Sequence, residues 1–380
     1  MRIAMTAQHL CVRASQMGLA AKRFGHEVHL ILHPESMGRQ FNEKFDSLQV
    51  WHSKEQLAAA IKRVQPDIIH TQDRPHLLTV EVIELGLGIP VVQDVHDMDS
   101  MLDMPMGHPL AEAKSLLRSD GLVFVSQPCL DYAERWLGPL PPAVVVPSAT
   151  CHSFMPTQRL PHVGGAVWQG GLYPEPPNSP RRYIDQIDIV RSFRNQDQAV
   201  FLHPAPNGYP DNIRPYAAEG AIVGPPMAYL PLLKTLTRYD FGWYGQTTNA
   251  EQIHKTLPNK LFDYIAAGLP VLVIRANEAA KFVTEHGVGL AIDSPDQFGT
   301  VKDELLKLRS EVWKKRHELT RERVIHPLLQ LYERLAGKTG AKETTDEKGN
   351  LELRNGGDGE PIAVPERAVG GYEVHNPVAD

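Results

Sequence analysis

The sequence LPNKLFDYIAAGLPVLV, residues 257–273, decides how this chain folds. Asn259 is a residue type that caps helices, so we predict a helix over residues 260–267. Gly268 suits the end of that helix, and the proline two residues later prevents its continuation. The apolar run at residues 271–274 then predicts a buried strand. A buried strand that directly follows a short helix is typical of an α/β protein with a parallel sheet.

The same alternation of short apolar runs and helical patterns extends along the chain in both directions. In the first half we expect strands at residues 2–6, 28–32, 67–70, 90–94, 121–126 and 144–147, and helices at 14–24, 54–64 and 77–85. In the second half we expect strands at 166–169, 199–203, 221–223, 241–244 and 289–292, and helices at 182–193, 229–237 and 279–285. Short, wholly apolar strands between helices indicate parallel sheets that are covered on both faces.

The pattern predicts two Rossmann-like parallel-sheet domains that face a cleft, followed by C-terminal helices and a flexible tail. The expected parts are an N-terminal domain at residues 1–152, a linker at 153–164, a second domain with the C-terminal helices at 165–335, and a disordered tail at 336–380. The linker is placed where prolines and mixed polarity interrupt the alternation. The tail is placed where glycines are frequent and no periodic apolar pattern remains.

Composition excludes several classes of protein. The 380 residues carry a formal charge of −6, which argues against general nucleic-acid binding. The three cysteines are odd in number and far apart, so we expect free thiols rather than disulfides or a zinc site. No apolar run is long enough to span a bilayer, and the first residues lack a signal-peptide core, so we expect a cytoplasmic protein. The charged segment 307–323 is either a solvated helix face or a helix that rests on a membrane surface.

The start of the helix predicted at residues 260–267 is a candidate anion site. Its free backbone N–H groups and dipole attract negative charge, and Lys260 adds a positive charge there. Asp263 lies one turn further along and can accept hydrogen bonds from two neighbouring hydroxyl groups. A diphosphate beside a ribose would meet both features.

The run PNKLFD, residues 258–263, with the following AAGLPV, residues 266–271, resembles the donor-site signature of GT-B glycosyltransferases, especially glycosyltransferase family 4 (group 1). In that family a Pro-Asn-Lys-Leu-Phe-Glu run precedes a small-residue helix and Gly-x-Pro-Val. The resemblance implies a retaining, hexosyltransferase-type enzyme with a nucleoside diphosphate sugar as co-substrate, no cofactor and no metal. It leaves a glycan, a lipid-linked glycan, a protein or a small molecule as the acceptor.

The resemblance also implies roles for residues near the motif. Asp263 would bind the donor ribose, and the backbone from Asn259 through Lys260 and Leu261 to Phe262 would hold the diphosphate. The adjacent glycines Gly170 and Gly171 follow the first strand of the second domain, where the family has a similar turn close to the phosphates.

Four further residues complete the expected site. Arg181 and Arg182 lie where the family places a basic residue that neutralises the diphosphate, and with Lys260 they would stabilise the leaving group. Met227 ends a loop that resembles the one that contacts the nucleobase, and His96 at a strand end would face the donor sugar. We assign catalytic roles to His96, Arg181 and Lys260, and donor binding to Gly170, Gly171, Arg182, Met227, Asn259, Leu261, Phe262 and Asp263.

Two departures from the family pattern keep alternatives open. Lys255 stands where the family often has a first glutamate, with Glu251 four residues earlier, and the loop at residues 6–13 lacks paired glycines. Both favour a catalytically inert nucleotide-sugar-binding or scaffold protein of the same fold. A sugar-nucleotide epimerase is a second alternative, although we identify no pair of acid–base carboxylates for it. The sequence argues against a dinucleotide dehydrogenase, because no G-x-G-x-x-G follows the first strand. In the loop at 6–13, His9 and Arg13 are candidates to face the acceptor.

Overall fold

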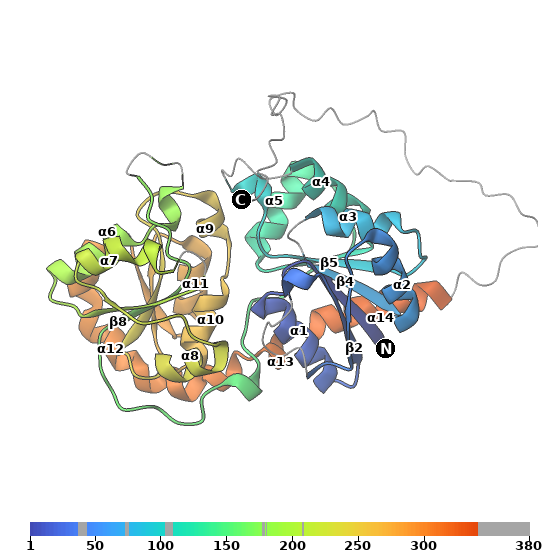
Figure 1. Cartoon of the computed structure of the whole chain (residues 1–380). Helices are drawn as coiled ribbons and strands as arrows, with labels where there is room; N and C mark the ends of the chain where they lie inside the picture. The colour runs from blue at the N-terminus through green and yellow to red at the C-terminus, as the bar shows by residue number, and fades with distance from the viewer. Residues whose placement is uncertain are drawn as a thin grey trace, which may run out of the picture. The chain divides into compact units, whose positions relative to one another are not determined.

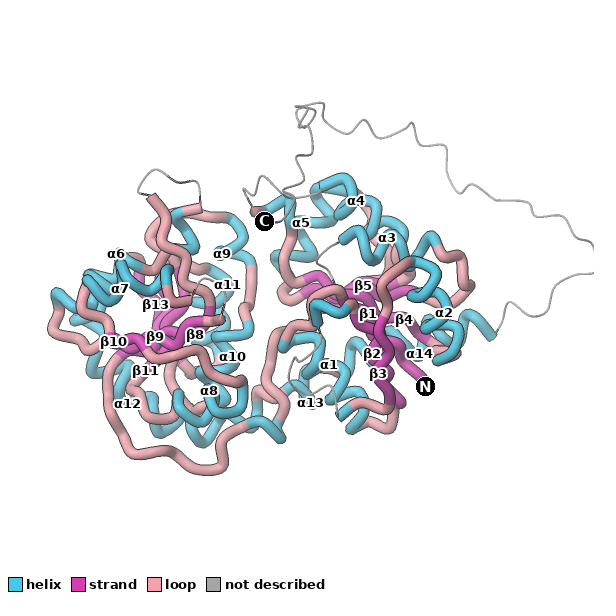
Figure 2. Tube along the Cα trace, viewed as in Figure 1, coloured by secondary structure: helices cyan, strands magenta, loops and turns pink. Residues whose placement is uncertain are grey.

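The structure is a computed structural model that describes residues 1–36, 44–72, 76–102, 109–176, 179, 181–206 and 209–340, without the side chains of 338–340. Within this part the chain forms two sheets in which every strand pair is parallel, as the sequence predicts (Figure 1). Helices enclose the strands of each sheet (Figure 2). The predicted disordered tail lies outside the described residues from residue 341 onward.

The first sheet has seven strands in the order β3-β2-β1-β4-β5-β6-β7. Its strands are β1 (Arg2–Ala7), β2 (Glu27–Leu32), β3 (Ser47–Val50), β4 (Ile68–Gln72), β5 (Val91–Val95), β6 (Gly121–Phe124) and β7 (Ala143–Val145). The helices that connect them are α1 (Val12–Arg23), α2 (Lys54–Val64), α3 (His76–Glu84), α4 (Pro109–Arg118) and α5 (Gln127–Leu137). The strand order reverses between β1 and β4, so the carboxyl ends there border a crevice of the kind that binds ligands.

The second sheet has six strands in the order β10-β9-β8-β11-β12-β13, and its order reverses between β8 and β11. Its strands are β8 (Ala166–Gly170), β9 (Val200–Pro204), β10 (Ile222–Val223), β11 (Phe241–Gly245), β12 (Val271–Ile274) and β13 (Gly289–Ile292). Its helices are α6 (Ile187–Asn195), α7 (Arg214–Ala218), α8 (Tyr229–Leu236), α9 (Glu251–Lys255), α10 (Asn259–Ala266), α11 (Asn277–Glu285) and α12 (Phe298–Lys315).

The last two helices, α13 (Arg321–Val324) and α14 (His326–Gly340), return to the first sheet. Leu331 and Leu335 lie so close to Gly121 of β6 that a Cβ added to this glycine would be 3.0–3.1 Å from them. The Tyr332 hydroxyl is 2.7 Å from His70 Nδ1 on β4. The sequence predicts that residues up to 335 belong with the second domain, but α14 packs against strands of the first sheet.

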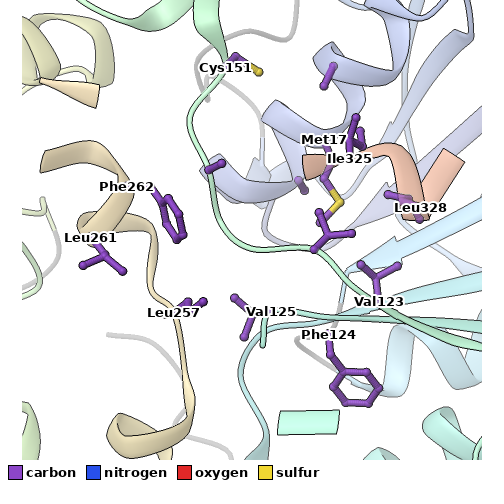
Figure 3. Packing of buried hydrophobic residues seen from close by; sticks show 14 of the residues in the cluster. Met17, Val123, Phe124, Val125, Cys151, Leu257, Leu261, Phe262, Ile325 and Leu328 are labelled. Carbon is purple, nitrogen blue, oxygen red and sulfur yellow. The ribbon is translucent and has the colours of Figure 1, made fainter. Parts of the chain in front are cut away.

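A continuous apolar core joins the two halves. It contains Val125 and Cys151 of the first half together with Leu257, Leu261 and Phe262 of the second. Figure 3 shows Leu257 close to Val125, and Phe262 on the side of its helix that faces the first half. Polar contacts supplement this core, since the Ser126 hydroxyl donates to the Lys255 carbonyl oxygen at 2.5 Å.

Helix α10 is closed by the predicted glycine, but its start differs from the prediction. It starts at Asn259, one residue earlier than expected, and no side chain caps its first turn, so the predicted capping role of Asn259 is wrong. At the other end Gly268 has a φ of 72°, and the N–H groups of Gly268 and Leu269 bond to the carbonyls of Ile265 and Tyr264. This pattern closes the helix by a glycine in the left-handed region.

Replacing Gly268 with alanine is expected to destabilise the second half. The new Cβ would lie 2.3 Å from Trp313 of α12, and the φ of 72° disfavours any residue with a side chain. We expect the free energy of unfolding to fall by about 2 kcal/mol, measured by urea denaturation. Gly337→Ala is the control, because that helical glycine has nothing within 4 Å of a new Cβ and should gain stability. A Gly268→Ala variant as stable as the parent would contradict this account.

Five elements were not predicted: β3, α4, α5, α7 and α9. In addition, the helix expected at 182–193 is divided into a 3₁₀ turn at Arg182–Ile184 and helix α6. Asp185 causes the division, because its extended backbone ends the turn and its carboxylate accepts from the Ile187 N–H at 2.9 Å. No described helix is both long and apolar enough to cross a membrane.

Candidate functional site

The carboxyl end of β8 and the first turn of α10 meet where the second sheet reverses its strand order. A Cβ added to Gly170 at the end of β8 would be 3.6 Å from both Cε and Nζ of Lys260. The start of α10 is accessible to solvent, because Pro258, Asn259 and Lys260 are each partly exposed. A helix N-terminus at such a position presents its first backbone N–H groups to a ligand.

Lys260 places a positive charge at this corner. Its Nζ lies 3.6 Å from the centre of the Trp168 ring, so the ring face holds the ammonium group. Burial lowers the pKa of Lys260 from 10.5 to about 7, and the nearby Asp263 offsets only part of this effect. No carboxylate of the described residues forms an ion pair with Lys260. A bound anion would therefore supply the partner that the ammonium group lacks.

Gly170 ends β8 and Gly171 directly follows it, and a different structural constraint favours glycine at each position. Gly170 has a φ of 117°, in the region that favours glycine, and its carbonyl accepts from the Ala205 N–H. Gly171 lies against Tyr173, and an added Cβ would be 2.2 Å from that ring. Of the two glycines, Gly170 is the one whose added Cβ would meet Lys260, and the predicted approach of both to the donor phosphates stays a prediction.

Asp263 is buried, with 3% of its surface exposed, and is held by three donors from three segments. Its Oδ1 accepts from the Tyr229 hydroxyl at 2.5 Å and from the Thr150 hydroxyl at 3.4 Å. Its Oδ2 accepts from Gln169 Nε2 at 2.9 Å. Two carboxylate oxygens offer about four acceptor positions, so one position on Oδ2 remains for a ligand hydroxyl.

Burial and hydrogen bonding have opposite effects on the pKa of Asp263. Burial raises the pKa of this carboxyl from 3.8 to about 7, although its three donors and Lys260 favour the charged form. Burial together with the Asp263 charge also keeps the pKa of Tyr229 well above its usual value of 10, so the phenol stays protonated. The result is a lysine with a lowered pKa and an aspartic acid with a raised pKa on one helix turn, both shifted mainly by burial.

The remaining predicted donor residues around α10 differ in what they can offer. Leu261 and Phe262 bury their side chains in the core, and the Leu261 N–H already bonds to the Pro258 carbonyl at 3.2 Å. The amides of Asn259 and Lys260 are thus the better candidates for a phosphate, since helix geometry leaves them without intrahelical partners. Met227 is half-buried in the loop before α8.

The structure places Arg181 and Arg182 among acidic groups. Arg182 forms ion pairs with Asp185 at 2.5 Å and Asp188 at 2.8 Å, and it donates to the Glu175 carbonyl. Arg181 Nε is 3.6 Å from Glu175. Arg182 lines a cavity of about 770 Å³ beside the switch point, but neither arginine is hydrogen-bonded or ion-paired to described residues of α10. Arg182 is therefore a poor source of free positive charge for the diphosphate.

His96 lies at the loop after β5, where Nδ1 is 3.5 Å from Asp94. Its carbonyl oxygen and the Asp97 carboxylate are 3.5 Å and 3.3 Å from Gln252 Nε2 of α9. His96 thus sits where the first half contacts the second. Its predicted contact with the donor sugar stays a prediction.

Lys255, in the place of the family's usual glutamate, forms an ion pair with Glu251 at 3.3 Å. Both line a cavity of about 850 Å³ after the ends of β11, β12 and β13, together with Asn249, His254, Arg275, Asn277 and Asp293. Glu251, four residues before the position of the family's glutamate, therefore shares one cavity with Lys255.

The two acceptor candidates of the first loop, Arg13 and His9, differ in their exposure to solvent. Arg13 is fully buried and pairs with Asp94 at 2.9 Å, so it supports the fold and cannot face an acceptor. His9 is about half exposed and lies 3.5 Å from Glu35.

Four residues of the Asp263 environment were missed by sequence reasoning: Gln16, Thr150, Gln169 and Tyr229. They come from α1, the segment after β7, the end of β8 and the start of α8. Gln169 directly precedes Gly170 near the end of β8, so its position near a strand end was the signal that the sequence offered. The other three carry no local motif.

Comparison with known proteins bears on these features. Residues 12–153 match the glycosyltransferase family 4 model, and residues 227–324 match the model of the glucosyltransferase 3-like C-terminal domain. The second match includes α10 and the residues around Lys260 and Asp263. None of the curated proteins compared with the chain matches it.

Several solved structures share the fold over most of the chain. Sucrose-phosphate synthase from Thermosynechococcus elongatus has a TM-score of 0.67 at 13% identity, covering 89% of this chain and 99% of its own. HepE from Anabaena, in complex with UDP-glucose, has a TM-score of 0.64 at 13% identity, with 90% and 100% covered. A glycosyltransferase from Rickettsia africae has a TM-score of 0.60 at 10% identity, with 88% and 98% covered. At these identities the likeness establishes the fold, which is GT-B.

Proposed function

Since the chain is a glycosyltransferase with the GT-B fold, we propose that it transfers a hexosyl group from a nucleoside diphosphate sugar with retention of configuration. The observation that carries the proposal is the position of Lys260. Its ammonium group, at the open start of α10 and beside Gly170, has no acidic partner within ion-pair distance among the described residues. An anion is the ligand that such a corner favours.

In this proposal the diphosphate binds to Lys260 and to the first amides of α10. The remaining acceptor position of Asp263 takes a ribose hydroxyl one turn further along the helix. When the bond to the sugar breaks, negative charge develops on the departing diphosphate, and the ammonium group and helix amides stabilise it. HepE, which shares the fold, is solved with UDP-glucose, and this supports a sugar nucleotide as the donor class.

A donor screen tests the proposal. The protein is heated with UDP-glucose, GDP-mannose, ADP-glucose or dTDP-glucose, and its melting temperature is recorded. A ligand at about 100 times its Kd should stabilise the native state by about 2.7 kcal/mol. We expect at least one of the four to raise the melting temperature, and the matching nucleoside diphosphate to do so as well. If none of the four binds, the proposal fails. NMR of the transferred or hydrolysed sugar then shows whether the anomeric configuration is retained.

A catalytically inert binder of the same fold is the alternative that one observation favours. Lys255 occupies the cavity of about 850 Å³ with a positive charge and neutralises Glu251 there. Donor binding without sugar transfer or slow hydrolysis would support this alternative.

The proposal includes a cytoplasmic location. Helix α12 buries Phe298, Leu305 and Val312, and its Lys314 pairs with Glu311 on the exposed side. This arrangement supports the solvated-face interpretation of the charged segment over a membrane-surface helix.

A further inference from the structure

A chain of buried hydrogen bonds leads from the first half of the protein to Asp263. The Cys151 N–H donates to Gln16 Oε1 at 2.5 Å, and Gln16 Nε2 donates to the Tyr229 hydroxyl at 3.0 Å. The Tyr229 hydroxyl in turn donates to Asp263 Oδ1. All four residues are buried, so water does not compete for these bonds.

The direction of every bond in this chain is fixed by chemistry. A backbone N–H can only donate, so the Gln16 amide must turn its oxygen toward Cys151 and its nitrogen toward Tyr229. An amide nitrogen also can only donate, so the Tyr229 oxygen accepts there and its single proton is the one that the ionised Asp263 carboxylate accepts. Tyr229 has no alternative orientation in which both contacts persist.

Packing restricts the same side chains. The Tyr229 ring lies 6.1 Å from the Phe154 ring in an edge-to-face arrangement. Met17, which follows Gln16 in the sequence, and the Cys151 side chain lie in the same apolar core as Phe262 (Figure 3). The Asp263 carboxylate is thus oriented by groups that belong to both halves.

We propose that Tyr229 and Gln16 are positioning residues for donor binding: they aim the Asp263 carboxylate at the donor and make its orientation depend on the first half. This inference rests on the proposed function, because it assumes that Asp263 contacts the donor. It goes beyond that function, because it assigns Gln16, from the first half, a role in binding a donor that the proposed function places on the second half. The residues that hold the carboxylate are then as much a part of the donor site as the motif at 258–263.

The test compares Tyr229→Phe and Gln16→Leu with Tyr239→Phe, by isothermal titration with the four sugar nucleotides named above. Tyr239 is the matched control, since it is a buried tyrosine of the same half whose hydroxyl bonds to His203 Nε2 at 2.8 Å. We expect Tyr229→Phe to weaken donor binding about tenfold and Gln16→Leu at least threefold, while Tyr239→Phe changes it less than twofold. A uniform loss in all three variants would mean general loosening and would overturn the inference.

A pH profile distinguishes positioning from a merely structural effect. The ionisable groups around Asp263 are Lys260 and Tyr264 on its own helix and Tyr229 on α8, whose hydroxyl also senses Arg321 of α13. Without the Tyr229 proton the Asp263 carboxylate is less stabilised, so its pKa rises. We expect the acidic limb of donor binding to move about one pH unit upward in Tyr229→Phe and not in Tyr239→Phe.

The outcomes separate this inference from the proposed function. If Tyr229→Phe binds donor like the parent at every pH while Asp263→Asn does not, the inference falls and the proposed function stands. If Asp263→Asn also binds normally, the assumed contact between Asp263 and the donor is wrong. Should Tyr229→Phe fail to fold by circular dichroism, Gln16→Leu carries the test, because it leaves Tyr229 in place.

Discussion

Replacing Lys260 with methionine is expected to abolish donor binding while making the free protein more stable. The methionine fills a similar space against Trp168 but removes the charge that faces the donor diphosphate. Loss of a charge-assisted contact in a site shielded from water costs about 3 kcal/mol, so affinity should fall about 100-fold or more. Isothermal titration with the sugar nucleotide that binds best measures this loss.

The gain in stability follows from the pKa of Lys260. Its folded-state pKa of about 7 lies below its unfolded value of 10.5, so the stability it contributes is present above 10.5 and lost as pH falls through 7. At neutral pH the buried ammonium group is therefore a cost to the fold, which the variant avoids. The melting temperature of Lys260→Met should exceed that of the parent at pH 7, by a margin that narrows toward pH 9.5.

Two controls accompany this variant. Lys314→Met removes a lysine that is 67% exposed on α12, so it should change neither affinity nor stability much. Lys260→Arg keeps the positive charge at all accessible pH values. The parent should lose affinity about tenfold per pH unit above 7, because donor binding requires the ammonium form, whereas Lys260→Arg should not. Donor binding by Lys260→Met within threefold of the parent would refute the role of Lys260.

Replacing Asp263 with asparagine is expected to weaken donor binding about 100-fold without unfolding the protein. The asparagine oxygen can still accept from Tyr229 and Thr150, and the Gln169 amide can turn to accept from the new amide nitrogen. What the variant loses is the charged acceptor that a ribose hydroxyl would use. Affinity is measured as for Lys260, with Asp303→Asn on the exposed side of α12 as the control.

The stability of Asp263→Asn should depend on pH in a defined direction. The folded-state pKa of Asp263, about 7, lies above its unfolded value of 3.8. Its contribution to stability is therefore fully present below 3.8 and lost as pH rises through 7. The variant should melt higher than the parent at pH 8 and show little advantage at pH 5. Normal donor affinity in this variant would remove Asp263 from the ribose role and leave the role of Lys260 intact.

The parts of the fold that the sequence predicted well are those with local causes. Strand β12 was predicted to the residue, and α10 within one residue at each end, because a proline, a glycine and an apolar run delimit them. Strand β3 was missed because it is an edge strand whose residues are partly exposed, and only its distant pairing with β2 defines it. Helix α5 was missed because it buries only Cys129, Leu130 and Ala133, a narrow apolar side.

The residues of the candidate site also divide into those with a local signal in the sequence and those without one. Gly170, Lys260 and Asp263 could be identified because each stands beside a strand end or helix start that the sequence marks. Thr150 and Tyr229 could not, because they reach Asp263 only after segments far apart in the chain have packed together. Arg182 differs from both groups, since its charge looked available in the sequence but is ion-paired with Asp185 and Asp188.

The return of α14 to the first sheet means that the polypeptide crosses between the halves twice. The two crossings are joined, because Thr150 and Thr320 form a parallel bridge and the Arg321 N–H bonds to the Thr150 carbonyl at 3.0 Å. Two joined crossing segments restrict any opening motion to a rotation about these segments, whereas a single flexible linker would allow motion in more directions. The return of α14 also means that a fragment cut at residue 152 would leave Gly121 and its neighbours without their cover of Leu331 and Leu335. Such a fragment should aggregate, whereas one that carries residues 321–340 as a grafted segment has the means to stay folded.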